Sequence, residues 1–293
     1  MKRRSFIGYA LLLASGCTMA SQTSSGIADN TDVLHFSVTD VKGLDPLEED
    51  YEPFRAALEN VLGRPVAFYP VETSTTAAAG LQSGDIEIAL AGPTEYVVIR
   101  ARTNAIPVIA ITRPNYYSIG VVPAESPVKS IADLKGKTLA MSDLGSTSGH
   151  LGPTWMLVEA KLDPKTDYQV KFLGDEGSLE ALQNREVDGW FGSLTDYEQF
   201  LERSQQSEDA FRVIVKSPPL PSDVLMVNSN THPDFIETLR EKALRHQEEL
   251  TTALASRPGT VKYRGSELTA VSDGDYDSIR EAYRAIGQGQ FLK

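Results

Sequence analysis

Residues 142–150, Ser-Asp-Leu-Gly-Ser-Thr-Ser-Gly-His, form a hydroxyl-rich turn between a predicted strand and a predicted helix. The preceding residues 138–142 (TLAMS) have the composition of a short buried strand, and apolar residues recur at helical spacing from 151 to 162. Two glycines let the backbone approach a ligand closely, and the first N–H groups of a helix have no partner within it. Together with three hydroxyl groups, these N–H groups favour an anionic ligand. The same hydroxyl groups are also typical helix caps, so the stretch alone leaves both roles open.

The chain on both sides of this turn alternates between short apolar strands and helices. This order predicts an α/β fold of mainly parallel sheets flanked by helices, with ligands bound at the carboxyl ends of the strands. A further strand from 224, a long helix over 233–255 and a final helix over 276–286 complete the pattern. The earlier predicted elements are strands at 33–39, 66–69, 86–91, 106–111, 118–122, 170–173, 187–191 and 211–215, and helices at 53–62, 74–82, 149–161 and 179–184.

Two proline-containing segments, 113–117 (RPNYY) and 216–221 (KSPPLP), predict where the chain passes between two lobes. We therefore expect lobe one to comprise residues 33–115 plus 220–293, and lobe two to comprise residues 116–219. A weak internal repeat relates residues 81–96 to residues 182–197, and each copy ends in Thr, an acidic residue and Tyr. If both copies face one cleft, Tyr96 and Asp196 lie opposite each other.

The first 17 residues have the pattern of a bacterial lipoprotein signal peptide. Three basic residues precede the apolar run 6–14, which is too short to span a bilayer. Residues 14–17 (ASGC) resemble a lipobox, which makes Cys17 the expected lipid attachment residue; cleavage without a lipid, and export by the Sec or the twin-arginine route, stay open. Residues 18–32 are expected to form a flexible tether. The predicted location is the periplasm or the outer face of the inner membrane.

Composition excludes several classes of protein. The 293 residues carry a formal net charge of −12, so nucleic acid is not an expected partner. Cys17 is the one cysteine in the sequence, which rules out a disulfide scaffold. No His/Asp cluster has the spacing of metal ligands, and we expect neither a metal nor a cofactor. The GSTSG motif has Thr147 at its centre where a hydrolase elbow has the nucleophile, so we do not expect an enzyme.

Five motifs, spread from residue 92 to residue 276, carry a likeness to one family. They are 92–96 (GPTEY), 130–137 (SIADLKGK), 146–150 (STSGH), 217–223 (SPPLPSD) and 272–276 (SDGDY). This pattern resembles the phosphate/phosphite/phosphonate-binding proteins of ABC importers, the PhnD-like family, with its phosphite-binding branch favoured. The resemblance implies a two-lobed type II periplasmic-binding-protein (Venus flytrap) fold. It also implies a monomeric receptor that closes on a small phosphorus oxyanion and delivers it to the permease and ATPase of an importer.

The resemblance also implies a set of ligand-binding residues. Lobe two would supply four donors to the ligand oxygens, namely Ser146, Thr147, Ser148 and His150. From lobe one, the hydroxyl group of Tyr96 would reach across the cleft. Asp196 would complete the pocket by accepting a hydrogen bond from a protonated ligand. Purely structural roles stay open, namely helix capping by Asp196, lobe packing by Tyr96 and a satisfied first-turn His150. Residues 40–44 (DVKGL) offer no aromatic contact for a large substituent, so we place phosphite first. Phosphate, methylphosphonate and aminoethylphosphonate are the alternatives, and a ligand-sensing subunit of a signalling system is the alternative from another class.

Overall fold

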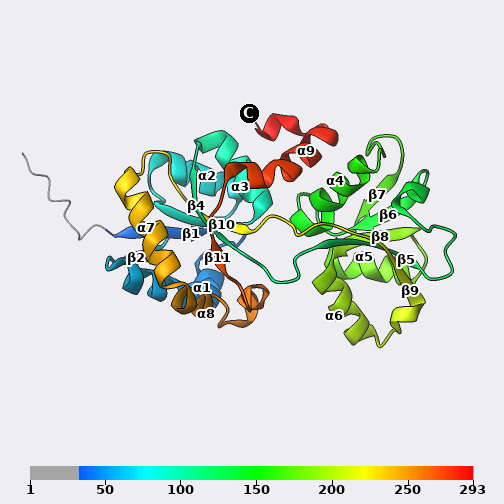
Figure 1. Ribbon diagram of the computed structural model, residues 1–293, viewed down its shortest axis with the longest axis horizontal. Helices are drawn as coiled ribbons and strands as arrows, with labels where there is room; N and C mark the ends of the chain where they lie inside the picture. The colour runs from blue at the N-terminus through cyan, green and yellow to red at the C-terminus, as the bar shows by residue number, and fades with distance from the viewer. Residues whose placement is uncertain (1–32, 293) are drawn as a thin grey trace, which may run out of the picture. The chain divides into compact units, whose positions relative to one another are not determined.

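The computed structural model describes residues 33–292. The predicted leader, Cys17 and the tether lie outside these residues. Two sheets, each flanked by helices, confirm the predicted α/β, two-lobed class (Figure 1). Within residues 33–292 no helix combines the length and the apolar character needed to cross a membrane.

Lobe one is built on a six-stranded mixed sheet with the order β11-β4-β10-β3-β1-β2. Strand β1, next to the edge strand β2, is parallel to β2 and β3, whereas β10 runs antiparallel between β3 and β4. Since β10 and β11 follow lobe two in the chain, two separate stretches of sequence share this sheet. The strands are β1 (Leu34–Val38), β2 (Val66–Phe68), β3 (Ile88–Ala91), β4 (Ile106–Ile111), β10 (Asp223–Val227) and β11 (Leu268–Thr269).

Lobe two is built on a five-stranded sheet with the order β7-β6-β8-β5-β9. Strand β6 is parallel to β7 and β8, and β5 is antiparallel to β8 and β9. The parallel strands β6 and β8 therefore end at the same edge of the sheet, and the loops that follow them are neighbours. The strands are β5 (Ser118–Pro123), β6 (Thr138–Met141), β7 (Gln169–Phe172), β8 (Gly189–Ser193) and β9 (Phe211–Lys216).

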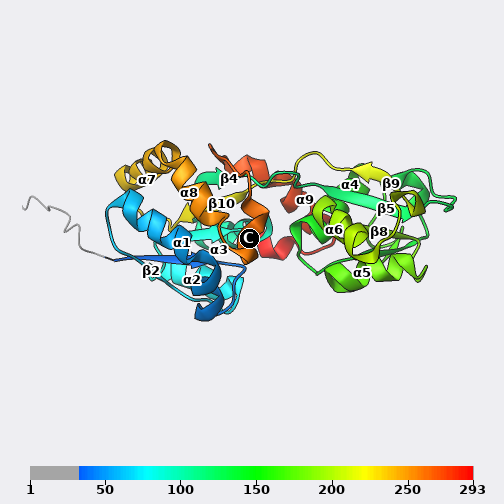
Figure 2. The ribbon, with the colours of Figure 1, turned by 90° about the horizontal axis from the view of Figure 1, so that it is seen from below.

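Helices cover both faces of the lobe-one sheet because neighbouring strand residues point to opposite faces. Ile88 and Leu90 face the core under α1 (Leu44–Leu62), α7 (Pro233–Arg245) and α8 (Gln247–Leu254). Ala89 and Ala91 face the core under α2 (Ser74–Ser83), α3 (Pro93–Thr103) and α9 (Asp277–Ala285). Figure 1 shows α2 and α3 on one side of this sheet and α1 and α8 on the other, and in Figure 2 α1 and α8 lie in front of it.

The lobe-two sheet divides its side chains in the same way. Trp190 packs with α5 (Gly174–Gln183) and α6 (Leu194–Ser204), and its indole N–H donates to Ser178 Oγ at 2.8 Å. Phe191 packs on the other face, with α4 (Gly152–Glu159). The two lobes touch where α4 meets α9, and there Trp155 Nε1 donates to Glu281 Oε2 at 3.2 Å. Short 3-10 turns connect the larger elements at Ile131–Leu134, Glu208–Ala210, Pro258–Tyr263, Asp273–Tyr276 and Gly289–Leu292.

Three helices differ clearly from their predicted extent, and one of them, α5, begins at Gly174 rather than at Leu179. Helix α1 begins at Leu44 rather than at Pro53, which lies inside it. Buried Leu47 and Tyr51 continue its apolar stripe N-terminal to the proline, so packing on the sheet outweighs the one backbone hydrogen bond that proline removes. The long helix expected over 233–255 is divided at His246 into α7 and α8.

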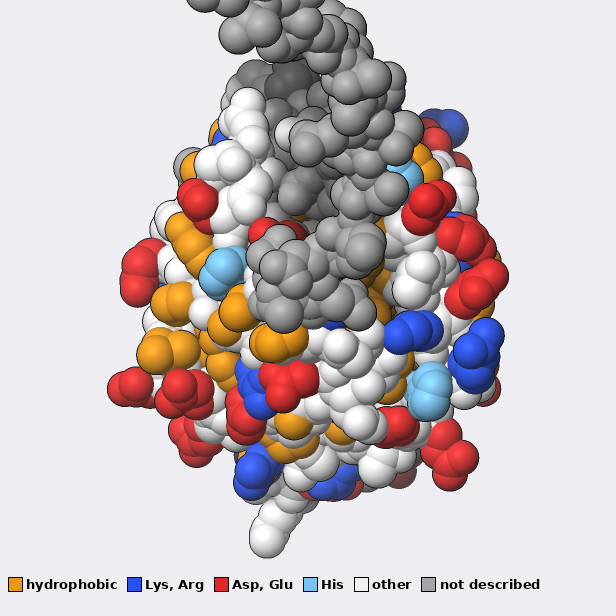
Figure 3. Space-filling view, turned by 90° about the vertical axis from the view of Figure 1, so that its left-hand side faces the viewer, with side chains coloured by type: hydrophobic (Ala, Val, Ile, Leu, Met, Phe, Trp, Pro, Cys, Tyr) orange, Lys and Arg blue, Asp and Glu red, His pale blue; other side chains and the backbone are white. Residues whose placement is uncertain are grey.

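The excess of acidic residues in the chain is not concentrated on the face drawn in Figure 3. Carboxylate and cationic side chains are interspersed over that face, with hydrophobic side chains between them.

Candidate ligand-binding site

A cavity of about 490 Å³ lies between the two lobes. The crossing segment 113–116 forms one part of its wall. Lobe two contributes the turn after β6 and the first turns of α5 and α6, while lobe one contributes residues 261–264. Among the predicted site residues, Ser146, Ser148 and Asp196 line this cavity.

The turn at 142–150 is tightly folded, and glycine is needed at two places in it. Gly145 has a φ of +92°, a conformation that L side chains rarely adopt. A Cβ at Gly149 would overlap Ser142 Oγ, so the two backbone segments approach as closely as glycine allows. A single π-helical turn, Thr147–Leu151, then leads into α4 in place of a regular first helical turn. The hydroxyl groups are thereby placed at the edge of the sheet where β6 ends.

Ser146 both caps this turn and keeps a proton that it can donate. Its Oγ accepts from the N–H of Gly149 at 3.1 Å. A serine hydroxyl has one donor and two acceptor positions, so the O–H is still available to an oxyanion in the cavity. Capping and anion binding are thus compatible functions of the same side chain.

Thr147 connects the lobes. Its Oγ1 lies 2.6 Å from Thr94 Oγ1, which belongs to the first turn of α3 in lobe one, and both side chains are buried. The backbone carbonyl of the next residue, Ser148, accepts from Ser118 Oγ at 2.8 Å. These contacts fix the turn relative to lobe one and to β5, and Ser148 lines the cavity between them.

His150 is held inside the turn and does not line the cavity. Its Nδ1 accepts from the N–H of Gly145 at 2.9 Å, and its ring meets Phe172 edge-on with centroids 4.8 Å apart. Burial lowers the pKa of His150 to about 4. The imidazole is therefore neutral near pH 7 with its proton on Nε2, because Nδ1 is an acceptor.

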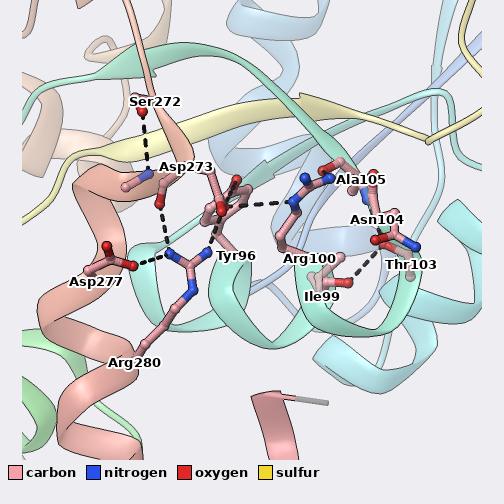
Figure 4. A network of polar contacts seen from close by, with 11 residues as sticks. Tyr96, Ile99, Arg100, Thr103, Asn104, Ala105, Ser272, Asp273, Asp277 and Arg280 are labelled. Carbon is pink, nitrogen blue, oxygen red and sulfur yellow. Dashed lines mark hydrogen bonds and ion pairs between the residues drawn. The ribbon is translucent and has the colours of Figure 1, made fainter.

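Tyr96 lies in the core of lobe one, and the structure does not bring it to the cavity or opposite Asp196. Its hydroxyl donates to Asp273 Oδ1 at 2.7 Å, and Arg280 Nη2 contacts the same oxygen at 2.6 Å (Figure 4). The Tyr96 ring packs on Tyr276 with centroids 4.4 Å apart. The two Thr-acid-Tyr segments are the first turns of α3 and α6, and the tyrosine of each turn faces its own core.

Asp196 is the residue of this pair that reaches the cavity. The N-cap of α6 is Ser193, whose Oγ accepts from the N–H of Asp196 at 3.0 Å. The Asp196 carboxylate is therefore not the capping group and remains available as an acceptor. Asp175, which also lines the cavity, has a pKa that is raised by burial and by the nearby Asp196 carboxylate. A proton on Asp175, or one carried by a ligand, would reduce the repulsion between the two carboxyl groups.

Sequence reasoning missed a buried ion pair beside the cavity. Arg113 Nη2 lies 2.6 Å from Asp223 Oδ1, and the guanidinium carbon stands 3.8 Å from the centroid of the Tyr116 ring. The other oxygen of Asp223 accepts from the Tyr263 hydroxyl at 2.6 Å. Arg113 and Pro114 had marked the crossing in the sequence, but the distance along the chain to Asp223 gave no signal of the pairing.

Lys262 is a second cation that the sequence did not single out. Its Nζ pairs with Asp40 Oδ2 at 3.2 Å, and the Asp40 carboxylate raises the pKa of Lys262 against the lowering effect of burial. Asp40 belongs to the segment 40–44, which offers no aromatic contact for a large substituent of the ligand. The structure places a cation from the far end of the chain next to that segment. Across residues 33–292 no three His, Cys, Asp or Glu side chains are placed to hold a metal ion.

The chain matches a known protein family over most of its length. The family described as "ABC transporter, phosphonate, periplasmic substrate-binding protein" matches residues 36–276. The phosphate-import protein PhnD of Mycolicibacterium smegmatis is 24% identical over 298 residues, which cover 94% of this chain and 93% of that protein.

Two solved structures share the fold. A Xanthomonas citri protein bound to ATP superposes with a TM-score of 0.67 at 16% identity, covering 88% of this chain and 98% of the other. PhnD1 of Prochlorococcus marinus in complex with methylphosphonate has a TM-score of 0.63 at 17% identity, covering 87% and 98%. These comparisons confirm the predicted fold, and the proteins of the matched family serve transport rather than catalysis. The chain belongs to the family of periplasmic phosphonate substrate-binding proteins of ABC transporters.

Proposed function

We propose that this receptor of a phosphonate or phosphate importer binds the head group of a phosphorus oxyanion between Ser146, Ser148 and Asp196. One observation carries the proposal. Two hydroxyl groups at a helix start and one carboxylate that does not cap a helix line the same inter-lobe cavity. Hydroxyl and backbone N–H groups donate to P–O oxygens without adding charge, and burial strengthens these bonds. Asp196 can only accept, so it favours a ligand that still carries a proton.

Thr147 and His150 position this head-group site in the proposal. Thr147 fixes the turn against α3 of lobe one, and His150 holds it closed through Gly145. Neither side chain lines the cavity, so their effect on the ligand passes through the turn. Tyr96 influences the turn less directly. Its hydroxyl group bonds to Asp273 and so anchors α3, the helix that carries Thr94.

Hydrogen phosphite is the smallest ligand that satisfies every group of the head-group site. It has three oxygens that can accept hydrogen bonds and one O–H group that can donate a hydrogen bond to Asp196. Fully deprotonated sulfate has no proton, so its oxygens would face the carboxylate unpaired. Phosphate and phosphonates share the head group of phosphite, and two of the similar proteins are described with phosphate import and with bound methylphosphonate.

The proposal extends to how the receptor works in the cell. The family places it outside the cytoplasm. We propose that it acts as a monomer, held at the membrane through a lipid on Cys17, and that it delivers its ligand to the permease and ATPase of the importer. Closure of the lobes would bring residues 261–264 of lobe one toward a head group held by Ser148 and Asp196 of lobe two.

Substitutions in the head-group site should weaken binding at least tenfold. Ser148→Ala removes a donor, and Asp196→Asn replaces the acceptor for the ligand proton, so each should cost about 1.4 kcal/mol or more in phosphite and methylphosphonate affinity. Isothermal titration calorimetry of the purified protein measures this. Ser229→Ala, an exposed serine outside the cavity, is the matched control and should bind as the wild type does. Unchanged affinity in both site variants would place the ligand elsewhere, and tight binding of sulfate alone would overturn the proposal.

A further inference from the structure

The inter-lobe cavity has its cations and its carboxylates on different walls. Arg113, at the crossing, and Lys262 and Arg264, from lobe one, supply the positive charges. Lobe two supplies three carboxylates on the side of the hydroxyl groups, namely Asp175, Asp196 and Glu198. The head-group site proposed above is formed by the hydroxyl side and does not use the cationic wall.

We propose that this cationic wall is a second anion subsite, and that the preferred ligand is a phosphonate whose substituent carries a second acidic group. The inference rests on the proposed function, because it takes the phosphorus head group to lie against Ser146 and Ser148. It adds the chemical class of the substituent. Phosphite, which has no substituent, uses the head-group site alone.

The size of the cavity supports a ligand with a substituent. The cavity of about 490 Å³ is a cleft open to solvent, and a phosphite head group of four heavy atoms leaves room in it for a substituent. The remaining space lies between the hydroxyl groups of lobe two and residues 261–264 of lobe one, where a substituent would reach the cations.

The three cations keep hydrogen-bond donors for a ligand. Arg113 contacts Asp223 through Nη2, one nitrogen of a guanidinium that has five N–H donors. Lys262 pairs with one oxygen of Asp40, and its ammonium has three N–H donors. Arg264 is exposed and forms no ion pair with any residue in the range 33–292. Since Asp223 and Asp40 pair with the first two cations, Arg264 is the cation of this wall that a ligand anion can pair with directly.

The distribution of charge also fixes the orientation of the ligand. An acidic substituent placed toward lobe two would meet Asp175, Asp196 and Glu198, and like charges there would repel it. The head group tolerates Asp196 because it carries a proton that the carboxylate accepts. The head group therefore lies on lobe two, and the second acidic group lies toward Lys262 and Arg264.

The test compares two ligands that differ in this group. Calorimetric titration with methylphosphonate and with phosphonoacetate gives an affinity ratio for each form of the protein. We expect phosphonoacetate to bind the wild type at least tenfold more tightly than methylphosphonate. In Arg264→Gln and in Lys262→Gln the ratio should fall toward one. Arg245→Gln, an exposed arginine of α7 outside the cavity, is the control and should keep the wild-type ratio.

The outcomes separate this inference from the proposed function. If methylphosphonate binds and phosphonoacetate binds no better, the second subsite is overturned while the proposed function stands. If the wild type prefers phosphonoacetate but both variants keep the ratio, these cations do not form the subsite and the inference is wrong. If aminoethylphosphonate gains affinity instead, the substituent lies on the carboxylates of lobe two, which also overturns it. Binding of neither methylphosphonate nor phosphonoacetate would contradict both proposals.

Discussion

Replacing Arg113 with methionine should lower the free energy of unfolding by about 3 to 5 kcal/mol. Asp223 is only 1% exposed, and the Arg113 guanidinium at 2.6 Å is its cationic partner. Burial by itself would lower the pKa of Arg113, but the Asp223 carboxylate more than offsets this effect, so the pKa is raised. Methionine would fill part of the space and remove the guanidinium that contacts this buried carboxylate, which is the costly way to break such a pair.

Urea denaturation at pH 7 measures this loss, and a double variant isolates its cause. Asp223→Asn keeps an oxygen that can accept from Tyr263, so Arg113→Met combined with Asp223→Asn should recover much of the stability lost in Arg113→Met. Arg245→Met, on the exposed surface of α7, should change the free energy of unfolding by less than about 0.5 kcal/mol. A loss of under 1 kcal/mol in Arg113→Met would show that the pair does not stabilise the junction of the lobes.

Two buried groups should give the stability opposite dependences on pH. The folded-state pKa of His150 is about 4, below its ordinary value of 6.5, because burial disfavours the charged imidazolium. The unfolded state therefore binds more protons between these values, and this contribution is complete above pH 6.5 and is lost as the pH falls toward 4. A pKa lowered by this amount corresponds to about 3 kcal/mol.

Glu95 acts in the opposite direction. Burial, with the nearby Asp40 carboxylate, raises the pKa of Glu95 from 4.5 to about 7. The folded state then binds more protons between these values, so this contribution is complete below pH 4.5 and is lost as the pH rises toward 7. In the wild type the two dependences partly cancel.

Replacing either residue should leave the pH dependence that the other contributes to the free energy of unfolding. Relative to the wild type, Glu95→Gln should become more stable as the pH rises from 5 to 7, and His150→Asn should become less stable over the same range. Denaturation at pH 5, 6 and 7 gives the differences. Carboxylates with lowered pKa values, such as Asp273, titrate below this range in all three proteins and cancel. A difference that is flat with pH in either variant would mean that the group titrates normally.

The fold was predictable where the signal was local. Alternating strands and helices indicated the α/β class, and Ile106–Ile111 was predicted with its observed bounds. The start of α1 was not predictable, because Pro53 resembles a helix start and only packing against the sheet shows that the helix begins at Leu44. The antiparallel insertion of β10 between β3 and β4 depends on pairing across more than 110 residues, which periodicity does not report.

The candidate site divides in the same way. The turn at 142–150 was found because glycines, hydroxyl groups and a helix start are adjacent in sequence. Tyr96 was expected at the site from the family resemblance, and opposite Asp196 from the repeat. Both copies of the repeat begin a helix, but the direction of the Tyr96 side chain follows from the core between α3 and α9. The partners Arg113 and Asp223, and likewise Lys262 and Asp40, come together only through folding.

The most direct test of the central claim is a calorimetric comparison of methylphosphonate with methanesulfonate at pH 7. The two ligands have nearly the same shape, but only the phosphonate carries a proton that Asp196 can accept. The account predicts that methylphosphonate binds at least 100-fold more tightly, a difference of about 2.7 kcal/mol. Equal affinity for the two ligands, or tighter binding of methanesulfonate, would contradict it.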